Sequence, residues 1–392
     1  MDVGAVVTGA SYRALAVVRS LGRRGVATRV VRSDEHALAK SSRYAGGRLA
    51  WPAGDDSLRV EYLLELAGRE GLEGWVLIPT HDEEAALIAR HSDVLARRYR
   101  LTTPAWETLR PAYDKRCTHA LVARLGLDQP WTIFPAGAAE LANAEGHFPV
   151  VVKPAVKEGV NRLTVDKAWR ADDPDALRRR YLEACELVDP ELLMVQEFVP
   201  GNGHSQLSYA ALCSGGAVIA SLAARRIRQY PMDFGRASTY VETIDDTELE
   251  GDAGRLLAAM RFTGMVEVEF KRDARTGANL LLDVNPRAWG WQSLCARAGV
   301  DFPYLLWRLA KGDPVPTVRG AAGVRWVRMA TDVAAVAGEV TAGRLSPAAY
   351  LRSLRRPLEF AVFARDDPLP ALVGPLLTAR LVAGRLAGGR PV

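Results

Sequence analysis

Long apolar runs and paired cysteines are both missing from this chain of 392 residues. No apolar stretch reaches the roughly 18 residues that a membrane-spanning helix needs, and none has the form of a secretory leader. Cysteine is scarce: Cys117, Cys185, Cys213 and Cys295 lie far apart, without a C-x-x-C pair or a histidine at ligand spacing. We therefore expect reduced core thiols in a cytoplasmic protein, and neither a disulfide framework nor a zinc site.

A strong excess of one charge is also missing. The chain has 51 basic and 46 acidic residues and a net charge of +5, too small an excess for a nucleic-acid footprint, which needs clustered charge. The composition, 48% apolar and 25% charged, is that of an ordinary globular protein with enough apolar surface for a core. The length predicts two to three domains, and no nucleic-acid partner is expected.

The N-terminal hundred residues lack the glycines of a dinucleotide-binding turn. Gly9 is the only glycine in the turn VVTGASYRAL, so the G-x-G-x-x-G spacing is absent. No tyrosine is followed four positions later by lysine, so the acid–base pair of short-chain dehydrogenases is absent as well. The region nevertheless alternates strand-like and helix-like segments, which predicts a parallel α/β layer. The expected segments are 5–8, 12–22, 28–31, 58–67, 76–78 and 83–96.

Polar residues follow the strand expected at 75–78. One hypothesis gives Thr80 or Glu83 a substrate contact, because open sheets bind ligands at the carboxyl ends of their strands. The other treats Asp82 and Glu83 as charges that stabilise the first turn of the following helix.

The most informative residues lie between 264 and 287, GMVEVEFKRDARTGANLLLDVNPR. Two strand-like runs carry Glu267 and Glu269 on the first and Asp283 and Asn285 on the second. Because side chains alternate along a strand, each pair lies on one face of a predicted hairpin. Carboxylate and amide oxygens suit Mg²⁺ or Mn²⁺, so Glu269, Asp283 and Asn285 are expected ligands, with Glu267 in reserve. The alternative is an edge hairpin with solvated acids.

Pro286 ends the second run and Arg287 follows it, where a guanidinium can grip an anionic substrate. The tail LLLDVNPRAWGW resembles the last motif of the ATP-grasp superfamily, in which an acidic residue, a spacer, Asn and often Pro-Arg end a strand. The acid here is Asp283, one methylene shorter than the Glu of many relatives. Either the strand then sits closer to the metal, or only one ion is held firmly.

The resemblance extends upstream, where it implies residues that bind ATP. Lys115, at the start of a helix that Asp114 caps and Gly126 ends, resembles the first ATP lysine. Lys153, at the end of the run FPVVVKP, resembles the second, which meets the α-phosphate or the adenine edge. The loop AVKEGVNRLT, with Gly159 as its only glycine, resembles the loop that covers the phosphates.

The segment LLMVQEFVPG resembles the hinge whose backbone reads adenine. The ATP contacts expected there are Gln196, Glu197, Phe198 and Val199. By the same resemblance His204 faces ribose or phosphate, and the alternative is a solvated histidine in a turn.

Arginines and tryptophans complete the expected site. Arg225 and Arg226 resemble the basic position that steadies the γ-phosphate or an acyl phosphate, so they join Arg287 as expected catalytic residues; a surface ion pair is the alternative for either. Trp289 and Trp291 follow Arg287 as in carboligase-like members and the D-aspartate ligase type. They line an acceptor pocket or belong to the core.

The resemblance implies an α/β and α+β architecture. We expect a Rossmann-like domain over 1–110 and a two-lobed ATP-grasp domain over 111–315, with its small lobe at about 130–200 and its large lobe at about 201–315. A mostly helical extension is expected over 316–392.

The implied function is an ATP- and Mg²⁺-dependent carboxylate–amine ligase. It would form an amide or peptide bond through an acyl phosphate and release ADP and phosphate. The implied partners are a small carboxylic acid and an amine of the amino-acid kind, and a homodimer is expected. Two other hypotheses stay open: a nucleotide-binding relative with a kinase-like or non-ligating regulatory role, and an oxidoreductase that uses the N-terminal domain.

The C-terminal segments 345–364 and 369–386 combine apolar residues with arginines, and Asp366-Asp367-Pro368 separates them. The arginines are Arg352, Arg355, Arg356, Arg380 and Arg385. Such basic amphipathic helices either pack back onto the core or bind an anionic membrane surface or a protein partner.

Overall fold

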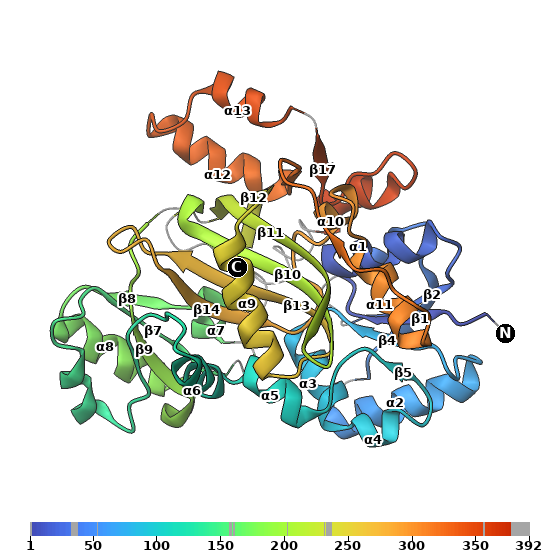
Figure 1. Ribbon diagram of the computed structural model, residues 1–392, viewed down its shortest axis with the longest axis horizontal. Coiled ribbons are helices and arrows are strands. Elements are labelled where there is room, and N and C mark those ends of the chain that lie inside the picture. The colour runs from blue at the N-terminus through green and yellow to red at the C-terminus, as the bar shows by residue number, and fades with distance from the viewer. Residues whose placement is uncertain are drawn as a thin grey trace.

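The computed structural model describes residues 2–32, 38–52, 54–156, 159, 161–201, 203–230, 232, 237–355 and 357–377. Within these residues the strands form three sheets. Figure 1 shows the largest sheet in the middle of the molecule, the N-terminal sheet on its right and the smallest sheet on its lower left.

The N-terminal α/β layer predicted from the sequence is confirmed as a parallel sheet in the order β3-β2-β1-β4-β5. β1 and β4 are buried on both faces, which explains their continuous apolar sequence. α2 and α3 cover one face and α1 covers the other. The elements are β1 (Ala5–Thr8), α1 (Tyr12–Gly22), β2 (Thr28–Arg32), η1 (Ala39–Ser41), β3 (Gly46–Ala50), α2 (Asp56–Arg69), β4 (Val76–Pro79), α3 (Asp82–Arg90), α4 (Ser92–Leu95), β5 (Arg100–Leu101) and α5 (Trp106–Tyr113).

Gly9 is explained by packing between two turns. Its φ is 88°, in the left-handed region. A Cβ at this position would overlap the Thr80 hydroxyl and would lie 2.6 Å from His81 Nδ1, in the turn after β4. The residue is therefore glycine because the turns after β1 and β4 approach each other closely.

The four-stranded sheet, in the order β6-β9-β7-β8, forms the small lobe with its helices. α8 packs Leu177, Tyr181 and Ala184 against it, at the spacing that places residues on one helix face. α6 begins at Asp114, whose carboxylate accepts a backbone N–H, and ends at Gly126 with a φ of 61°, as predicted. The elements are α6 (Lys115–Leu125), β6 (Thr132–Ile133), η2 (Ala138–Ala144), β7 (Val150–Pro154), α7 (Arg162–Asp166), β8 (Trp169–Ala171), α8 (Pro174–Cys185), η3 (Pro190–Leu192), β9 (Leu193–Glu197) and η4 (Gly203–Ser205).

The eight-stranded sheet forms the large lobe, in the order β14-β13-β10-β11-β12-β16-β17, with β15 paired to β11. α9 packs on one face, and α10, α11 and the N-terminal α1 pack on the other. The elements are β10 (Gln206–Ser214), β11 (Ala217–Tyr230), β12 (Ala237–Ile244), α9 (Thr247–Ala259), β13 (Gly264–Arg272), β14 (Asn279–Asn285), α10 (Ser293–Arg297), α11 (Phe302–Lys311), β15 (Val318–Arg319), β16 (Arg325–Val327), α12 (Met329–Thr341), α13 (Pro347–Ser353) and β17 (Leu358–Phe360).

The N-terminal domain and the large lobe share one hydrophobic core. Val7 of β1 and Leu15 of α1 belong to the same buried cluster as Met265 of β13 and Trp289. Met265 lies on the same face of β13 as Glu267, because side chains alternate along the strand. The shared core therefore fixes the N-terminal domain against the strands that carry the acidic residues.

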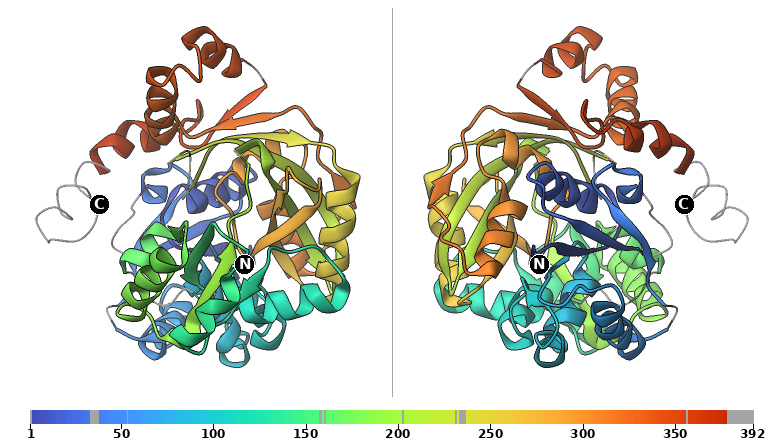
Figure 2. Two further views of the ribbon diagram at one scale, coloured as in Figure 1. Left: turned by 90° about the vertical axis from the view of Figure 1, so that its left-hand side faces the viewer. Right: turned by 90° about the vertical axis from the view of Figure 1, so that its right-hand side faces the viewer.

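The region after residue 315 is helical in α12, α13 and 369–377, but β16 and β17 also extend the large sheet beyond β12. Figure 2 shows α12 and α13 projecting from one end of the molecule. Arg356, Arg380 and Arg385 lie outside the described residues. Binding of the C-terminal helices to a membrane surface or a partner stays a prediction. No helix in the described residues is long and apolar enough to cross a membrane.

Asp367 attaches the C-terminal segment to the N-terminal domain. Its side chain accepts hydrogen bonds from Arg19 Nε at 2.9 Å, Ser42 Oγ at 2.6 Å and the Arg43 backbone N–H at 2.9 Å. Burial alone would raise the pKa of Asp367, but these hydrogen bonds and the Arg19 charge outweigh it and hold the pKa below its ordinary value.

Replacing Asp367 by alanine is expected to lower the free energy of unfolding by about 3 kcal/mol, because a buried Arg19 would lose its carboxylate. The contribution of the pair is fully present above the unfolded-state pKa of about 4 and is lost as pH falls through the lower folded-state pKa. Urea unfolding at pH 7 and at pH 3 measures both effects. The control is Asp366→Ala, whose carboxylate side chain is 40% exposed. Equal losses from the two variants at pH 7 would contradict the prediction.

Candidate functional site

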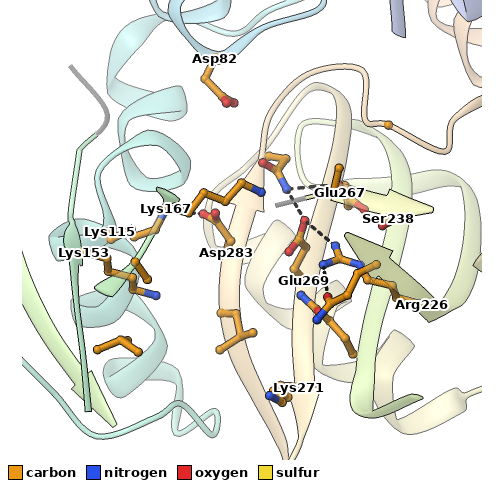
Figure 3. A pocket seen from close by; sticks show the side chains of 18 of the residues that line it. Asp82, Lys115, Lys153, Lys167, Arg226, Ser238, Glu267, Glu269, Lys271 and Asp283 are labelled. Carbon is orange, nitrogen blue, oxygen red and sulfur yellow. Dashed lines mark hydrogen bonds and ion pairs between the residues drawn. The ribbon is translucent and has the colours of Figure 1, made fainter. Parts of the chain in front are cut away.

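A cavity of about 420 Å³ opens between the small lobe, the large lobe and the N-terminal domain. Figure 3 shows Lys115 and Lys153 on one side of it and Glu267, Glu269 and Asp283 on the strands opposite. The predicted site residues that line it are Lys115, Lys153, Gln196, Glu197, Phe198, Val199, Arg226, Glu267, Glu269, Asp283, Asn285 and Arg287.

The acidic hairpin brings four polar side chains to one face. Glu267 pairs with Asn285 and Glu269 with Asp283 across the antiparallel strands β13 and β14. Directly opposed residues share a face of the sheet. Asn285 Nδ2 donates to Glu269 Oε1 at 3.1 Å and to Glu267 Oε2 at 3.2 Å, and Trp291 Nε1 donates to Glu267 Oε1 at 2.7 Å. Glu267 is 3% exposed, and burial together with the charge of Glu269 raises its pKa to about 7.

Replacing Glu267 by glutamine is expected to stabilise the ligand-free protein progressively as pH rises. The folded state holds the Glu267 proton more tightly than the unfolded state, so the wild type loses stability from the ordinary pKa of 4.5 up to about 7. Glutamine stays neutral, so the difference in the free energy of unfolding grows across this window and then levels off. Urea unfolding from pH 5 to pH 8, without metal or nucleotide, measures it. A difference that does not change with pH would contradict the raised pKa.

The donor set fits a hard divalent cation. Within the described ranges no three His, Cys, Asp or Glu side chains are grouped tightly enough to hold a metal by themselves. A cation here would therefore combine few protein oxygens with phosphate oxygens and water, as Mg²⁺ does. Burial and then the like charge of Glu269 raise the pKa of Glu267, and such a cation would offset the two carboxylate charges. Asn285 presents its oxygen to Arg287 at 2.7 Å, so it would have to release Arg287 to become a ligand.

Lys115 joins α6 to the acidic hairpin. Its Nζ donates to Asp283 Oδ1 at 2.6 Å, and the two side chains are 11% and 23% exposed. A cation on the first residue of α6 therefore lies directly beside a carboxylate of β14.

Lys153 is positioned by the neighbouring strand β9. Its Nζ donates to Gln196 Oε1 at 2.7 Å, and Gln196 Nε2 donates to Thr132 Oγ1 at 3.0 Å. Burial, followed by the charges of Lys153 and Lys115, lowers the pKa of the adjacent His119 to about 4. His119 is therefore neutral at pH 7, and the lysines supply the positive charge on this side of the cavity.

The predicted hinge follows β9 along the cavity wall. The backbone N–H of Glu197 donates to the Trp131 carbonyl at 2.9 Å, and that of Phe198 donates to the Pro149 carbonyl at 2.8 Å. The Glu197 carboxylate also accepts the Trp131 N–H at 3.3 Å. These bonds fix Glu197 and Phe198 against the preceding segments.

Arg225 and Arg226 point to opposite faces of β11, because side chains alternate along a strand. Arg226 lines the cavity, with its Nη2 3.7 Å from Glu269 Oε1. Arg225 pairs with Glu242 of β12 at 3.6 Å, the ion-pair alternative. Of the two, Arg226 is the one positioned for the predicted role at a phosphate.

Arg287 is held by Asp82 from the first turn of α3. Its Nε and Nη2 donate to the two carboxylate oxygens of Asp82 at 2.9 and 3.1 Å, and the guanidinium is 6% exposed. The helix-charge hypothesis for Asp82 is thus incomplete, because this carboxylate also links the N-terminal domain to the residue after β14. The positive charge of Arg287 is balanced by Asp82.

Three predicted residues lie elsewhere: the described residues that line the cavity do not include Gly159, His204 and Arg225. Gly159 is exposed with a φ of 69°, and Lys157 beside it lies outside the described residues. His204 is exposed in η4, which agrees with the turn alternative.

The structure also places the two tryptophans and the two polar residues that follow β4. Trp289 is fully buried, with ring centroids 5.5 Å from Trp291 and 5.2 Å from Phe302, so it belongs to the core. Trp291 lines the cavity. Thr80 is buried and donates its hydroxyl to a β1 carbonyl at 2.6 Å, whereas Glu83 is exposed in the first turn of α3.

Several cavity residues were not predicted. Arg13 and Asp82 occupy the first turns of α1 and α3, at the carboxyl ends of β1 and β4, where open sheets bind ligands. That rule could have indicated both. Lys271 shares a strand face with Glu269, which alternation could have indicated. Lys167 has a φ of 69°, unusual for lysine, and Figure 3 draws it beside Lys115; nothing in the sequence indicates its position.

Comparisons with known proteins identify the fold. A family described as "ATP-grasp in the biosynthetic pathway with Ter operon" matches residues 189–331, which include the acidic hairpin. No curated protein matches the sequence.

Similar solved structures include L-amino acid ligase from Bacillus licheniformis, at 14% identity and a TM-score of 0.61, covering 79% of this chain and 75% of that one. The biotin carboxylase domain of 2-oxoglutarate carboxylase from Hydrogenobacter thermophilus, in complex with Mg-ADP, ADP and bicarbonate, has 15% identity and a TM-score of 0.66, with coverage of 83% and 74%. Carboxyaminoimidazole ribonucleotide synthase from Aspergillus clavatus, complexed with ATP, has 15% identity and a TM-score of 0.61, with coverage of 83% and 81%. The chain therefore has the ATP-grasp fold, with a parallel α/β domain in front of it.

Proposed function

We propose that this protein is an ATP-dependent carboxylate–amine ligase that releases ADP and phosphate. The observation that carries the proposal is the composition of the cavity: Lys115 and Lys153 face the carboxylates of Glu269 and Asp283, and Arg287 lies beside them. Cations opposite a carboxylate pair suit a triphosphate with its metal, and a nearby guanidinium suits an acid. The solved relatives named above, a ligase and enzymes bound to ATP or Mg-ADP, support the same assignment.

Bound Mg²⁺, held by Glu269 and Asp283 with Glu267 or Asn285 in support, would neutralise phosphate oxygens during phosphoryl transfer. Lys115 and Lys153 add positive charge from α6 and β7, and Gln196 orients Lys153. Arg226 supplies a further guanidinium on the opposite wall. Such preorganised charges stabilise the transition state because they need no rearrangement when charge develops.

The proposed reaction has two steps. An oxygen of the substrate carboxylate attacks the γ-phosphorus of ATP, the bond to the bridging oxygen breaks, and ADP leaves. The amine nitrogen then attacks the acyl carbon of the acyl phosphate, and the carbon–oxygen bond breaks. The phosphate leaves with the amine proton as hydrogen phosphate. The first step is needed because a free carboxylate oxygen is a poor leaving group.

Release of ADP and phosphate from Mg-ATP tests this function. It is measured across amino acids and small carboxylic acids, each with and without a second amine. Release that requires both an acid and an amine is expected. Transfer to the acid alone would instead indicate a kinase-like activity, and nucleotide binding without release under any pairing would indicate the non-ligating alternative.

The state of the cysteines bears on the compartment in which the reaction is proposed to occur. The four cysteines are free thiols, which fits the cytoplasm as the proposed compartment. The expected homodimer stays a prediction.

A further inference from the structure

Arg13 is a half-buried cavity residue without a direct ion-pair partner among the described residues. It lies in the first turn of α1 and lines the cavity together with Tyr12, Asp82, Arg287 and Trp291. Its Nε is buried without a hydrogen-bond partner, and across the described chain its guanidinium has no hydrogen bond or ion pair.

Other buried arginines of this protein have carboxylate partners. Arg19 and Arg287 are each 2.9 Å from an aspartate oxygen, and Arg228 is 2.8 Å from one. Arg13 is half-buried, and its Nε is removed from water without a hydrogen-bond partner, which is costly. Burial and then the charge of Arg287 lower the pKa of Arg13 below its ordinary value, and the opposing charges of Asp82 and Glu267 do not offset them.

The position of Arg13 separates it from the groups suited to the triphosphate. Lys115 and Lys153 occupy the α6 and β7 side of the cavity, whereas Arg13 belongs to the N-terminal domain. Arg287 is close to Arg13, but both oxygens of Asp82 already accept its hydrogen bonds. On this wall Arg13 is therefore the arginine to which the described residues supply no paired anion.

The cavity wall beside Arg13 also includes Tyr12, Gly290 and Trp291. Gly290 lies against the Tyr12 phenol: a Cβ at position 290 would be 2.9 Å from the Tyr12 hydroxyl oxygen. A planar guanidinium matches the two oxygens of a carboxylate, and the Tyr12 hydroxyl and the Trp291 ring lie on the same stretch of wall.

We propose that Arg13 binds the carboxylate of the acid substrate, so that the N-terminal domain selects the acid that the ATP-grasp lobes activate. This inference rests on the proposed ligase function. It adds to that function the residue that recognises the free carboxylate, and it predicts that amides and esters of the acid are not bound.

The first experiment compares Arg13→Ala and Arg13→Lys with the wild type, using the acid that best supports ADP release. Loss of a bidentate charged contact is expected to raise KM for the acid about 100-fold in Arg13→Ala and less in Arg13→Lys. KM for Mg-ATP should change by less than about twofold, because Arg13 lies away from the phosphate lysines. The matched control is Arg69→Ala, which removes an exposed arginine outside the cavity. An unchanged KM for the acid in Arg13→Ala would overturn the inference.

A second measurement separates binding from a structural role and does not need turnover. Thermal melting is followed with each amino acid and with its amide, for the wild type and for Arg13→Met, which keeps most of the apolar stem. The wild type should be stabilised by at least one free acid more than by its amide, and Arg13→Met should lose that difference. Its ligand-free melting temperature should equal or exceed that of the wild type, because a half-buried charge without an ion-pair partner is removed.

The outcomes distinguish this inference from the ligase proposal. Acid binding that depends on Arg13, without ADP release, would support the inference and contradict the ligase function. ADP release that depends on an acid but is indifferent to Arg13 would support the ligase function and overturn the inference. A fall of several degrees in the ligand-free melting temperature of Arg13→Met, or no stabilisation of the wild type by any free acid over its amide, would also overturn it.

Discussion

Asp283→Ala is expected to lower kcat for ATP turnover by about 1,000-fold at saturating Mg²⁺. Two effects combine in this variant. The acidic hairpin loses the carboxylate opposite Glu269, and Lys115 loses the partner that holds its Nζ at 2.6 Å. Both changes weaken the charges arranged around the proposed phosphoryl transfer.

The matched variants identify which property of Asp283 matters. Asp283→Asn keeps the shape and removes the charge, so it should show nearly the same loss. Asp172→Ala is the control, because it removes a carboxylate that is 65% exposed on the small lobe. Steady-state ADP release with Mg²⁺ titrated to saturation measures all three. Wild-type turnover by Asp283→Ala would show that Asp283 has no role in the reaction.

Arg287→Ala is expected to lower acid-dependent ADP release by a factor of about 100 to 1,000, with nucleotide affinity changed only a few-fold. Arg287 holds Asn285 through a 2.7 Å hydrogen bond and holds Asp82 through two more. Its loss would leave the acidic hairpin and the N-terminal wall without their common partner, on the side where the acid is proposed to bind.

The companion variant is Asp82→Asn, which breaks the same ion pair but keeps the guanidinium. If the role of Arg287 is to bind or orient the acid, Asp82→Asn should lose less activity than Arg287→Ala. Calorimetric titration with ADP and Mg²⁺ gives nucleotide affinity, and ADP release against acid concentration gives the acid dependence. An unaltered acid dependence in Arg287→Ala would refute the role.

The shared face of the acidic hairpin could be predicted from local geometry. Glu267, Glu269, Asp283 and Asn285 reach one face because strand alternation and a short hairpin fix their positions within about twenty residues of sequence. The two ends of α6 were likewise marked, its start by Asp114 and its end by Gly126. Strand alternation also predicts from the sequence that Arg225 and Arg226 cannot both face the cavity. The structure shows which of them does.

The contacts that escaped prediction depend on how separate domains meet. Asp82 and Arg287 are 205 positions apart, and their pairing follows from the core that α1 shares with the large lobe. Arg13 enters the cavity for the same reason. Trp289 and Trp291 are both buried in the same hydrophobic cluster, and neighbours distant in sequence decide that Trp291 also borders the cavity. The strands β16 and β17 were not predicted from the sequence, because each has only three residues.

The most direct test of the proposed acyl phosphate is the transfer of a carboxylate oxygen from the acid substrate to the released phosphate. The acid identified by ADP release is labelled with oxygen-18 in its carboxylate, incubated with Mg-ATP and the amine, and the released phosphate is analysed by mass spectrometry. One oxygen-18 atom is expected in each phosphate formed, because the carboxylate oxygen that attacks the γ-phosphorus leaves with it. Phosphate without the label, in a reaction that still consumes acid and amine, would contradict activation through an acyl phosphate.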